Sequence, residues 1–202
     1  DKYDNLKKKG YIRNYIDKFI YQVIGKENIK NEIDIANKKI KELNITKIDY
    51  LLITHFHPNH MGIAQDILEI GTKLLMIDVQ KDYVHSSDSI FEREKNTNFK
   101  TINTNPVIIT CDESRAFLNS LGINGEIIHT PGHSDDNVSL VLDEGIAFVG
   151  DLYDLNSSLA FNDDTINNSW NKILSHNIKK IYYGHHEQTI NNIKRIEDTI
   201  TD

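Results

Sequence analysis

The stretch "ITHFHPNH", from Ile53 to His60, places three histidines in a short segment directly after an apolar run. His55 and His57 are two positions apart, so a tight loop can direct both rings to one metal ion, while His60 faces a neighbouring ion. Imidazole nitrogen is a common ligand of Zn²⁺ and similar divalent metals. Between these histidines lies Asn59, whose neutral amide oxygen is a weaker ligand than a carboxylate. The stretch predicts a metal-binding loop with one unusual residue.

The residues around this loop predict a strand, a helix and a second, parallel strand. "IDYLLIT" (48–54) and "KLLMID" (73–78) are nearly continuous apolar runs, as expected of strands that are covered on both faces. Between them, "MGIAQDILEIG" (61–71) predicts a helix that ends at a glycine. A strand, helix and strand in this order are typical of an α/β fold. The histidine loop therefore begins where a strand ends.

The rest of the chain predicts alternating helices and strands, with a hairpin near the middle. Helices are predicted at 11–24, 31–43, 89–95, 112–122, 164–176 and 187–200, and strands at 106–110, 126–130 and 179–184. The stretch "NVSLVLDEGIAFVG" (137–150) predicts two strands joined by a turn at 143–145. Because a hairpin adds antiparallel neighbours, the predicted fold class is α/β with mixed sheets and helices outside.

Three further polar positions each lie just after a predicted strand. They are His133 in "TPGHS", Asp151 in "VGD" and His185 in "YYGHH". In sheets covered by helices, ligands bind where strands end, because the loops converge on one edge there. Together with the histidine loop, this places five histidines and one aspartate at one rim. These are too many ligands for one tetrahedral ion, so two metal ions are expected.

Composition excludes several classes of protein. The chain has 202 residues, a formal net charge of −7, no Gly/Ser-rich linker and no repeat, which favours one domain and opposes attraction to nucleic acid or an anionic membrane. The single cysteine, Cys111, fits a reducing compartment, and no apolar stretch reaches the ~18 residues of a membrane span. We expect a cytoplasmic protein that binds a small-molecule substrate, with no nucleic-acid or membrane partner. A monomer and a dimer are both compatible with the sequence.

At these residues the chain resembles the metallo-β-lactamase-fold superfamily, whose pattern is His-x-His-x-Asp-His, a His after a Pro-Gly turn, an Asp after a Gly and a His after a Gly. The resemblance spans residues 48–186 and implies an αββα four-layer sandwich with a metal site at one edge. It also implies the ligands: the first metal is held by His55, His57 and His133, the second by His60, His185 and position 59, and Asp151 bridges the two.

The resemblance also bears on domain organisation. We expect a single domain over 1–202, with a helical segment at 1–45 and a metal-binding core at 46–202. Members of this superfamily usually begin with strands, whereas the N-terminal segment predicts helices. The usual N-terminal strands are therefore expected to be missing from this chain.

The function that the resemblance implies is metal-dependent hydrolysis, in which a metal-bound hydroxide attacks an ester, thioester, lactone or amide carbonyl. The expected cofactor is Zn²⁺, as one or two ions, with iron or manganese as alternatives. The predicted catalytic positions are Asp151, which positions the bridge, and Asn59. In the family, a carboxylate at position 59 binds the second metal and accepts a hydrogen bond from the attacking water, so Asn59 is expected to impair activity. An engineered substitution, a natural one-metal enzyme and a pseudoenzyme are three explanations that the sequence leaves open.

Two alternative functions stay open. An iron-dependent persulfide dioxygenase would, by resemblance, need only His55, His133 and Asp151, and a non-catalytic homologue would bind metal without turnover. Four aromatic residues are expected either to line an apolar wall of the substrate site or to be ordinary partly buried residues: Tyr83, Phe91, Tyr153 and Phe161. The remaining histidines are expected to be structural or exposed: His85, His129, His176 and His186.

Overall fold

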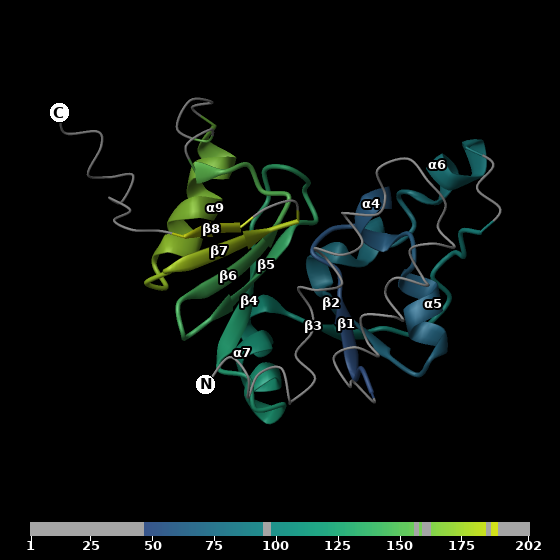
Figure 1. The fold of residues 1–202 in the computed structure, drawn as a ribbon, viewed down its shortest axis with the longest axis horizontal. Helices are drawn as coiled ribbons and strands as arrows, with labels where there is room; N and C mark the ends of the chain where they lie inside the picture. The colour runs from purple at the N-terminus through teal and green to yellow at the C-terminus, as the bar shows by residue number, and fades with distance from the viewer. Residues whose placement is uncertain (1–46, 95–97, 156–157, 159–162, 185–186, 190–202) are drawn as a thin grey trace. The chain divides into compact units, whose positions relative to one another are not determined.

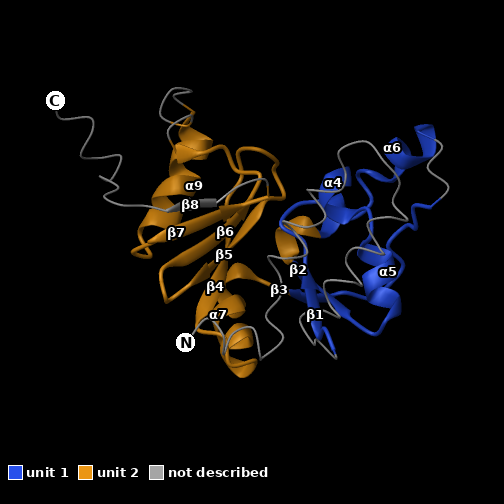
Figure 2. Cartoon of the chain, viewed as in Figure 1, with its two compact units in different colours: residues 1–76, 81–108 blue, residues 77–80, 109–202 orange. Residues whose placement is uncertain are grey.

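The computed structural model describes residues 47–94, 98–155, 158, 163–184 and 187–189 (Figure 1). The helices predicted at 11–24 and 31–43, the predicted ligand His185, and Phe161 and His186 lie outside these residues. The chain divides into two compact units, coloured separately in Figure 2: unit 1 contains residues 1–76 and 81–108, and unit 2 contains residues 77–80 and 109–202. Each unit has its own sheet and its own hydrophobic core.

Most of a three-stranded sheet belongs to unit 1, in the order β1-β2-β3. Its strands are β1 (Tyr50–Leu52), β2 (Lys73–Ile77) and β3 (Val107–Ile109). β1 and β2 are parallel, with Leu51 opposite Leu74. The chain between them forms two short helices, α4 (Pro58–Met61) and α5 (Ala64–Glu69). The predicted strand, helix and parallel strand are therefore present, and the histidine loop follows β1.

The single helix predicted at 61–71 is wrong in one respect, because it is divided. The backbone of Ile63 (φ −111°, ψ 12°) is not helical and separates α4 from α5. Met61 and Ile63 are both almost fully buried. Residues two positions apart do not share a face of a regular helix, so a local break allows both side chains to enter the core. The helical segment also begins earlier than predicted, at Pro58, which is favoured in a first helical turn.

The core of unit 1 surrounds the histidine loop. Phe56, between the first two histidines, is 1% exposed and packs with Met61, Ile63 and other apolar side chains. The following chain forms a 3₁₀ helix (Asp78–Tyr83) that crosses from one unit to the other and then α6 (Asp88–Arg93). Burial of Phe56 fixes the loop backbone, and this leaves the flanking histidines at defined positions.

Unit 2 contains a five-stranded mixed sheet in the order β4-β5-β6-β7-β8. Its strands are β4 (Gly125–His129), β5 (Val138–Leu142), β6 (Ile146–Gly150), β7 (Lys180–Tyr183) and β8 (Glu187–Thr189). β5 and β6 form the predicted hairpin, and only β6 and β7 are parallel neighbours. The prediction of a mixed sheet is confirmed.

Two helices of unit 2 pack on this sheet, α7 (Cys111–Ser120) and α9 (Asp164–Leu174). α9 buries Ile166, Trp170 and Ile173 against β6 and β7. At its N-terminus the carboxylate of Asp163 accepts hydrogen bonds from two backbone N–H groups, which would otherwise lack a partner inside the helix. Both helices lie close to the regions predicted from helical periodicity.

The closing helix predicted at 187–200 is wrong in its first residues. Glu187–Thr189 instead form β8, which pairs antiparallel with β7 so that Gln188 lies opposite Ile181. Pairing satisfies the backbone groups along this edge of β7, and such a tertiary contact outweighs a weak helical preference in the local sequence. Residues 190–200 lie outside the described part of the chain.

Candidate metal centre

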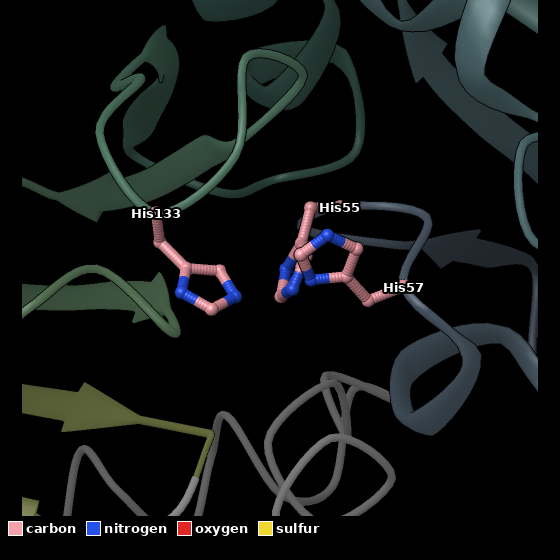
Figure 3. A group of neighbouring side chains, drawn as sticks. All are labelled: His55, His57 and His133. Carbon is pink, nitrogen blue, oxygen red and sulfur yellow. The ribbon is translucent and has the colours of Figure 1, made fainter.

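The three histidines of the loop after β1 form one cluster within unit 1. The ring of His55 lies with its centroid 4.6 Å from that of His57 and 4.0 Å from that of His60. His55 is fully buried and His60 is 3% exposed, whereas His57 is partly exposed. Figure 3 shows the rings of His55 and His57 projecting from this loop. The three histidine rings are therefore neighbours inside unit 1, and their assignment as metal ligands stays a prediction.

Local contacts hold the histidine loop in this conformation. The Thr54 hydroxyl lies 3.3 Å from Nδ1 of His55, and the hydroxyl of Ser87 donates to the carbonyl of Phe56 at 2.6 Å. The backbone N–H of His60 donates to the carbonyl of His57 at 2.9 Å, which closes the first turn of α4. A polar partner at Nδ1 orients a histidine so that its Nε2 faces the metal. Nε2 is buried in both His55 and His60.

Asn59 lies inside α4, between His57 and His60, and is partly exposed. The side chains that this loop offers to a metal are therefore three neutral imidazoles and one neutral amide. Imidazole suits zinc, iron and manganese, whereas the amide oxygen supplies no charge. Among the predicted ligands that the structure describes, Asp151 is the only carboxylate.

His133 and Asp151 form a second group, within unit 2. His133 lies on the loop after β4, where Figure 3 shows its ring, and Asp151 directly follows β6. Nε2 of His133 and Oδ2 of Asp151 are 3.8 Å apart, and their side chains are 23% and 9% exposed. This separation is too long for a hydrogen bond. A Zn–N bond and a Zn–O bond are each about 2 Å long, so an ion can bridge two ligand atoms that lie up to roughly 4 Å apart. One ion can therefore contact both atoms.

The loop that holds His133 is packed tightly against α9. Gly132 has a φ of +146°, and a Cβ at this position would lie 2.8 Å from Cγ1 of Ile166. The hydroxyl of Ser169 donates to the carbonyl of Pro131 at 2.7 Å, and the ammonium of Lys172 donates to the carbonyl of His129 at 3.1 Å. Glycine is required here because other residues rarely adopt this φ and their side chains would collide with the helix.

A buried asparagine, Asn137, joins the two loops of unit 2 that present ligands. Its Nδ2 donates to the carbonyl and hydroxyl oxygens of Thr130, both at 3.0 Å, and to the carbonyl of Val149 at 3.3 Å. Thr130 precedes His133 by three residues, and Val149 precedes Asp151 by two. Asn137 is 0% exposed. One side chain therefore fixes the end of β4 relative to the end of β6, a role that sequence reasoning missed because no local pattern signals it.

A backbone contact brings the end of β7 to the same place. The N–H of Gly184 donates to the carbonyl of Gly150 at 2.7 Å, and Gly150 has a φ of +62°, in the left-handed region that favours glycine. Gly150 immediately precedes Asp151 and Gly184 immediately precedes the predicted ligand His185. The segment that leads to His185 thus ends beside Asp151, and the assignment of His185 itself stays a prediction.

The donor chemistry fits a metal such as zinc, iron or manganese. Each of the five described residues offers one ligand atom: His55, His57, His60, His133 and Asp151. Four of the side chains are buried or mostly buried, and buried imidazole and carboxylate groups in neighbouring positions are typical of metal sites. The role of each residue as a ligand stays a prediction.

Three of the other histidines, His85, His129 and His176, have structural contacts, as predicted, and His186 lies outside the described residues. Nδ1 of His85 lies 3.0 Å from a carboxylate oxygen of Asp88, Nε2 of His129 lies 2.7 Å from the carbonyl of Asp135, and His176 lies 3.5 Å from the carboxylate of Glu126. These contacts account for the three side chains without a metal.

Two of the aromatic residues expected to line a wall belong to the core of unit 1 instead. Phe91 is 6% exposed and stacks on Phe99, and Tyr83 packs against the same cluster. Tyr153 is different, because 42% of its surface is exposed.

Cys111 begins α7, and burial raises the pKa of its thiol, which opposes a role as a nucleophile.

Comparison with known proteins identifies the family of this chain. Residues 25–185 match the family model of the Metallo-beta-lactamase superfamily. The Beta-lactamase-like protein 2 homolog of Drosophila melanogaster is 31% identical over 140 residues, which cover 68% of this chain and 44% of that protein. An Atrochrysone carboxyl ACP thioesterase of Aspergillus terreus is 26% identical over 126 residues, which cover 62% of this chain and 32% of that protein. The chain thus spans less than half the length of either relative.

Solved structures agree on the fold. The crystal structure of TTHA1623 in a di-iron-bound form superimposes with a TM-score of 0.58 at 20% identity, covering 76% of this chain and 79% of that one. This confirms the predicted fold class, a mixed α/β fold of the metallo-β-lactamase type. The chain belongs to the metallo-β-lactamase superfamily, because the family model covers most of its length. Among the described residues, no helix is long and apolar enough to cross a membrane.

Proposed function

We propose that this chain is a metal-dependent hydrolase of carbonyl substrates and that thioesters are the substrate class it favours. The observation that carries the proposal is the placement of five predicted ligands, which lie between residues 55 and 151 at or just after the ends of strands. They form two groups of imidazole and carboxylate side chains. Membership of the superfamily supports a hydrolase in general. The thioesterase name of the Aspergillus relative supports thioesters in particular.

In this proposal His55, His57 and His133 hold a first metal ion, and His60, Asp151 and His185 are available to a second. When bound, such an ion polarises the substrate carbonyl and lowers the pKa of a water molecule, which supplies electrophile and nucleophile together. The protein's part is to fix the imidazoles: burial of Phe56 and the contact of Thr54 with His55 hold the loop of unit 1.

Asp151 has two roles in this proposal. Its carboxylate, 9% exposed, can bind metal through one oxygen and accept a hydrogen bond from the attacking water through the other. Asn137 and the Gly150 to Gly184 contact hold the backbone before Asp151, so the carboxylate needs little reorganisation when substrate binds.

Asn59 makes the two metal positions unequal. Two dications bring a total charge of about +4, and replacing a carboxylate with an amide leaves one more positive charge unbalanced in a poorly solvated site. The first position uses His55, His57 and His133, so the amide at position 59 does not affect it. We therefore infer that the chain binds one ion firmly and a second weakly, and that hydrolysis is slower than in an enzyme with aspartate at position 59.

The test is metal analysis and hydrolysis of the wild-type protein beside Asn59→Asp. Each protein is loaded with zinc, dialysed and measured for metal per chain, then assayed with acyl thioesters, esters and lactones. We expect about one ion per chain for wild type and about two for Asn59→Asp, with faster hydrolysis by the variant. Asn168→Asp, an exposed position on α9, is the matched control for the charge change.

Two results would overturn the proposal. If Asn59→Asp gains neither a second ion nor activity, position 59 does not act on the second metal. If wild-type protein binds iron and consumes oxygen with a persulfide substrate while hydrolysing none of the panel, the chain is an oxidoreductase of the same fold.

A further inference from the structure

We propose that Tyr153 is a specificity-determining residue that contacts the apolar acyl group of the substrate. The inference rests on the proposed function and deepens it. Tyr153 would favour substrates with an extended apolar acyl group over acetyl esters and thioesters. Three features of unit 2 support it: a fixed backbone, an exposed ring and the position of that ring beside His133.

The backbone at Tyr153 is held from inside the core. Nε1 of Trp170 donates to the carbonyl of Tyr153 at 3.0 Å and lies 3.0 Å from the hydroxyl oxygen of Ser158. That hydroxyl lies 3.2 Å from the same carbonyl. Both Trp170 and Ser158 are 0% exposed. A backbone fixed by a buried indole holds the side chain in one place, so that ordering it on binding costs little conformational entropy.

The side chain of Tyr153 is nevertheless exposed. Leu152 is 1% exposed and Leu155 is 6% exposed, whereas Tyr153 between them is 42% exposed. Among the described residues it is the only aromatic side chain in the group of large exposed hydrophobic residues, the others being Ile70, Val79 and Ile108. A fixed, solvent-accessible aromatic ring provides apolar surface for a ligand.

The position of the ring defines which part of a substrate it can touch. The ring centroids of Tyr153 and His133 are 5.9 Å apart, with an angle of 72° between the planes. A substrate held beside His133 would therefore have the Tyr153 ring as a neighbour. An acetyl group has one carbon beyond the carbonyl, whereas an octanoyl group has a chain of seven carbons that can cover the ring. Apolar surface of the longer chain would then be removed from water against the ring.

The test compares acetyl and octanoyl thioesters of N-acetylcysteamine with wild type, Tyr153→Ala and Tyr153→Phe. For octanoyl substrate, we expect Tyr153→Ala to raise KM about five- to tenfold, with kcat changed less than twofold, as for removal of one apolar contact. For acetyl substrate KM should change less than twofold. Tyr153→Phe keeps the ring and should resemble wild type. Ile108→Ala is the control, since Ile108 is 40% exposed and lies on β3.

Binding measurements separate this inference from the proposed function. Thioether analogues that cannot be hydrolysed are titrated into zinc-loaded protein, and the octanoyl analogue should bind Tyr153→Ala about five- to tenfold more weakly than wild type. This holds even if no thioester is hydrolysed, an outcome that would contradict the proposed function alone. The inference is wrong if Tyr153→Ala weakens acetyl and octanoyl analogues equally, if Tyr153→Phe loses as much as Tyr153→Ala, or if wild type does not bind the octanoyl analogue. Equal zinc content in all variants excludes an indirect effect through the metal.

Discussion

Replacing Asn137 with alanine removes a buried side chain that joins the His133 loop to the Asp151 loop. The substitution deletes the donor to both oxygens of Thr130 and to the carbonyl of Val149. Asn137 is fully buried, so water does not readily replace the lost donor. We expect two effects, a loss of stability and a weaker metal site.

The size of the stability effect follows from the contacts. A hydrogen bond in a protein contributes a net ~0.5–1.5 kcal/mol, and leaving a buried acceptor without its donor costs ~1–3 kcal/mol. The three contacts share one donor group and are not additive, so we expect Asn137→Ala to lower the free energy of unfolding by about 2–4 kcal/mol. For a chain of this length that corresponds to a decrease in Tm of about 5–15 °C.

The effect on the metal site follows from the loosened loops. Loss of an outer hydrogen bond that orients a ligand typically weakens metal affinity by about 10–100-fold. We therefore expect zinc to bind Asn137→Ala more weakly than wild type by a factor in this range. Asn137→Asp keeps the shape but directs a carboxylate at three acceptor oxygens, so it should be more damaging than alanine.

Thermal unfolding of the metal-free proteins measures the first effect, and competition with a chromophoric zinc chelator at a temperature where the variants are folded measures the second. Asn168→Ala, on the exposed face of α9, is the control and should change neither quantity appreciably. If Asn137→Ala loses stability but keeps wild-type zinc affinity, the asparagine supports the fold without positioning ligands. If it changes neither, the reasoning about this contact is wrong.

Three further predictions follow from other parts of the structure. Gly132→Ala should lower the free energy of unfolding by roughly 1–3 kcal/mol, because the glycine has a φ of +146° and Ile166 is too close for a Cβ; urea unfolding measures this. Thr110→Ala should destabilise α7 by about 1 kcal/mol, because the Thr110 side chain caps this helix. Hydrogen bonds from the backbone N–H and the hydroxyl of Thr110 lower the pKa of the Glu113 carboxyl, and this contribution is present above the ordinary pKa near 4.5 and is lost as pH falls below it. Thr110→Ala removes only the hydroxyl, so its Tm difference from wild type should narrow in acid without vanishing, because the Glu113 N–H of the wild type still donates to Thr110 Oγ1. Removing metal with a chelator should lower Tm, and zinc at 100 times its Kd should restore about 2.7 kcal/mol; an unchanged Tm would contradict metal binding to the folded chain.

The sequence alone was sufficient for features that depend on neighbouring residues. The apolar run before Thr54 predicts a strand, and the spacing of His55, His57 and His60 predicts a cluster, because a tight loop leaves its side chains little choice of direction. The predicted hairpin around 143–145 is present for the same reason, since turn chemistry is local. The family resemblance was likewise readable from motifs.

Features that depend on long-range contacts required the tertiary structure. Trp170 holds the backbone of Tyr153 from 17 positions away, and Ser169 holds Pro131 from 38 positions away. The helix predicted from Glu187 instead begins as a strand, because β7 offers backbone groups for pairing. Nothing near these residues in the sequence specifies their partners.

Sequence therefore determined which side chains of this protein are available to bind metal and that most of them follow strands. The tertiary structure decided how they are held: Asn137 joins β4 to β6, and the packing of Gly132 on α9 fixes the His133 loop. The physical reason is that ligand identity is a property of single residues, whereas ligand position depends on hydrogen bonds and packing between segments that are brought together only when the chain folds.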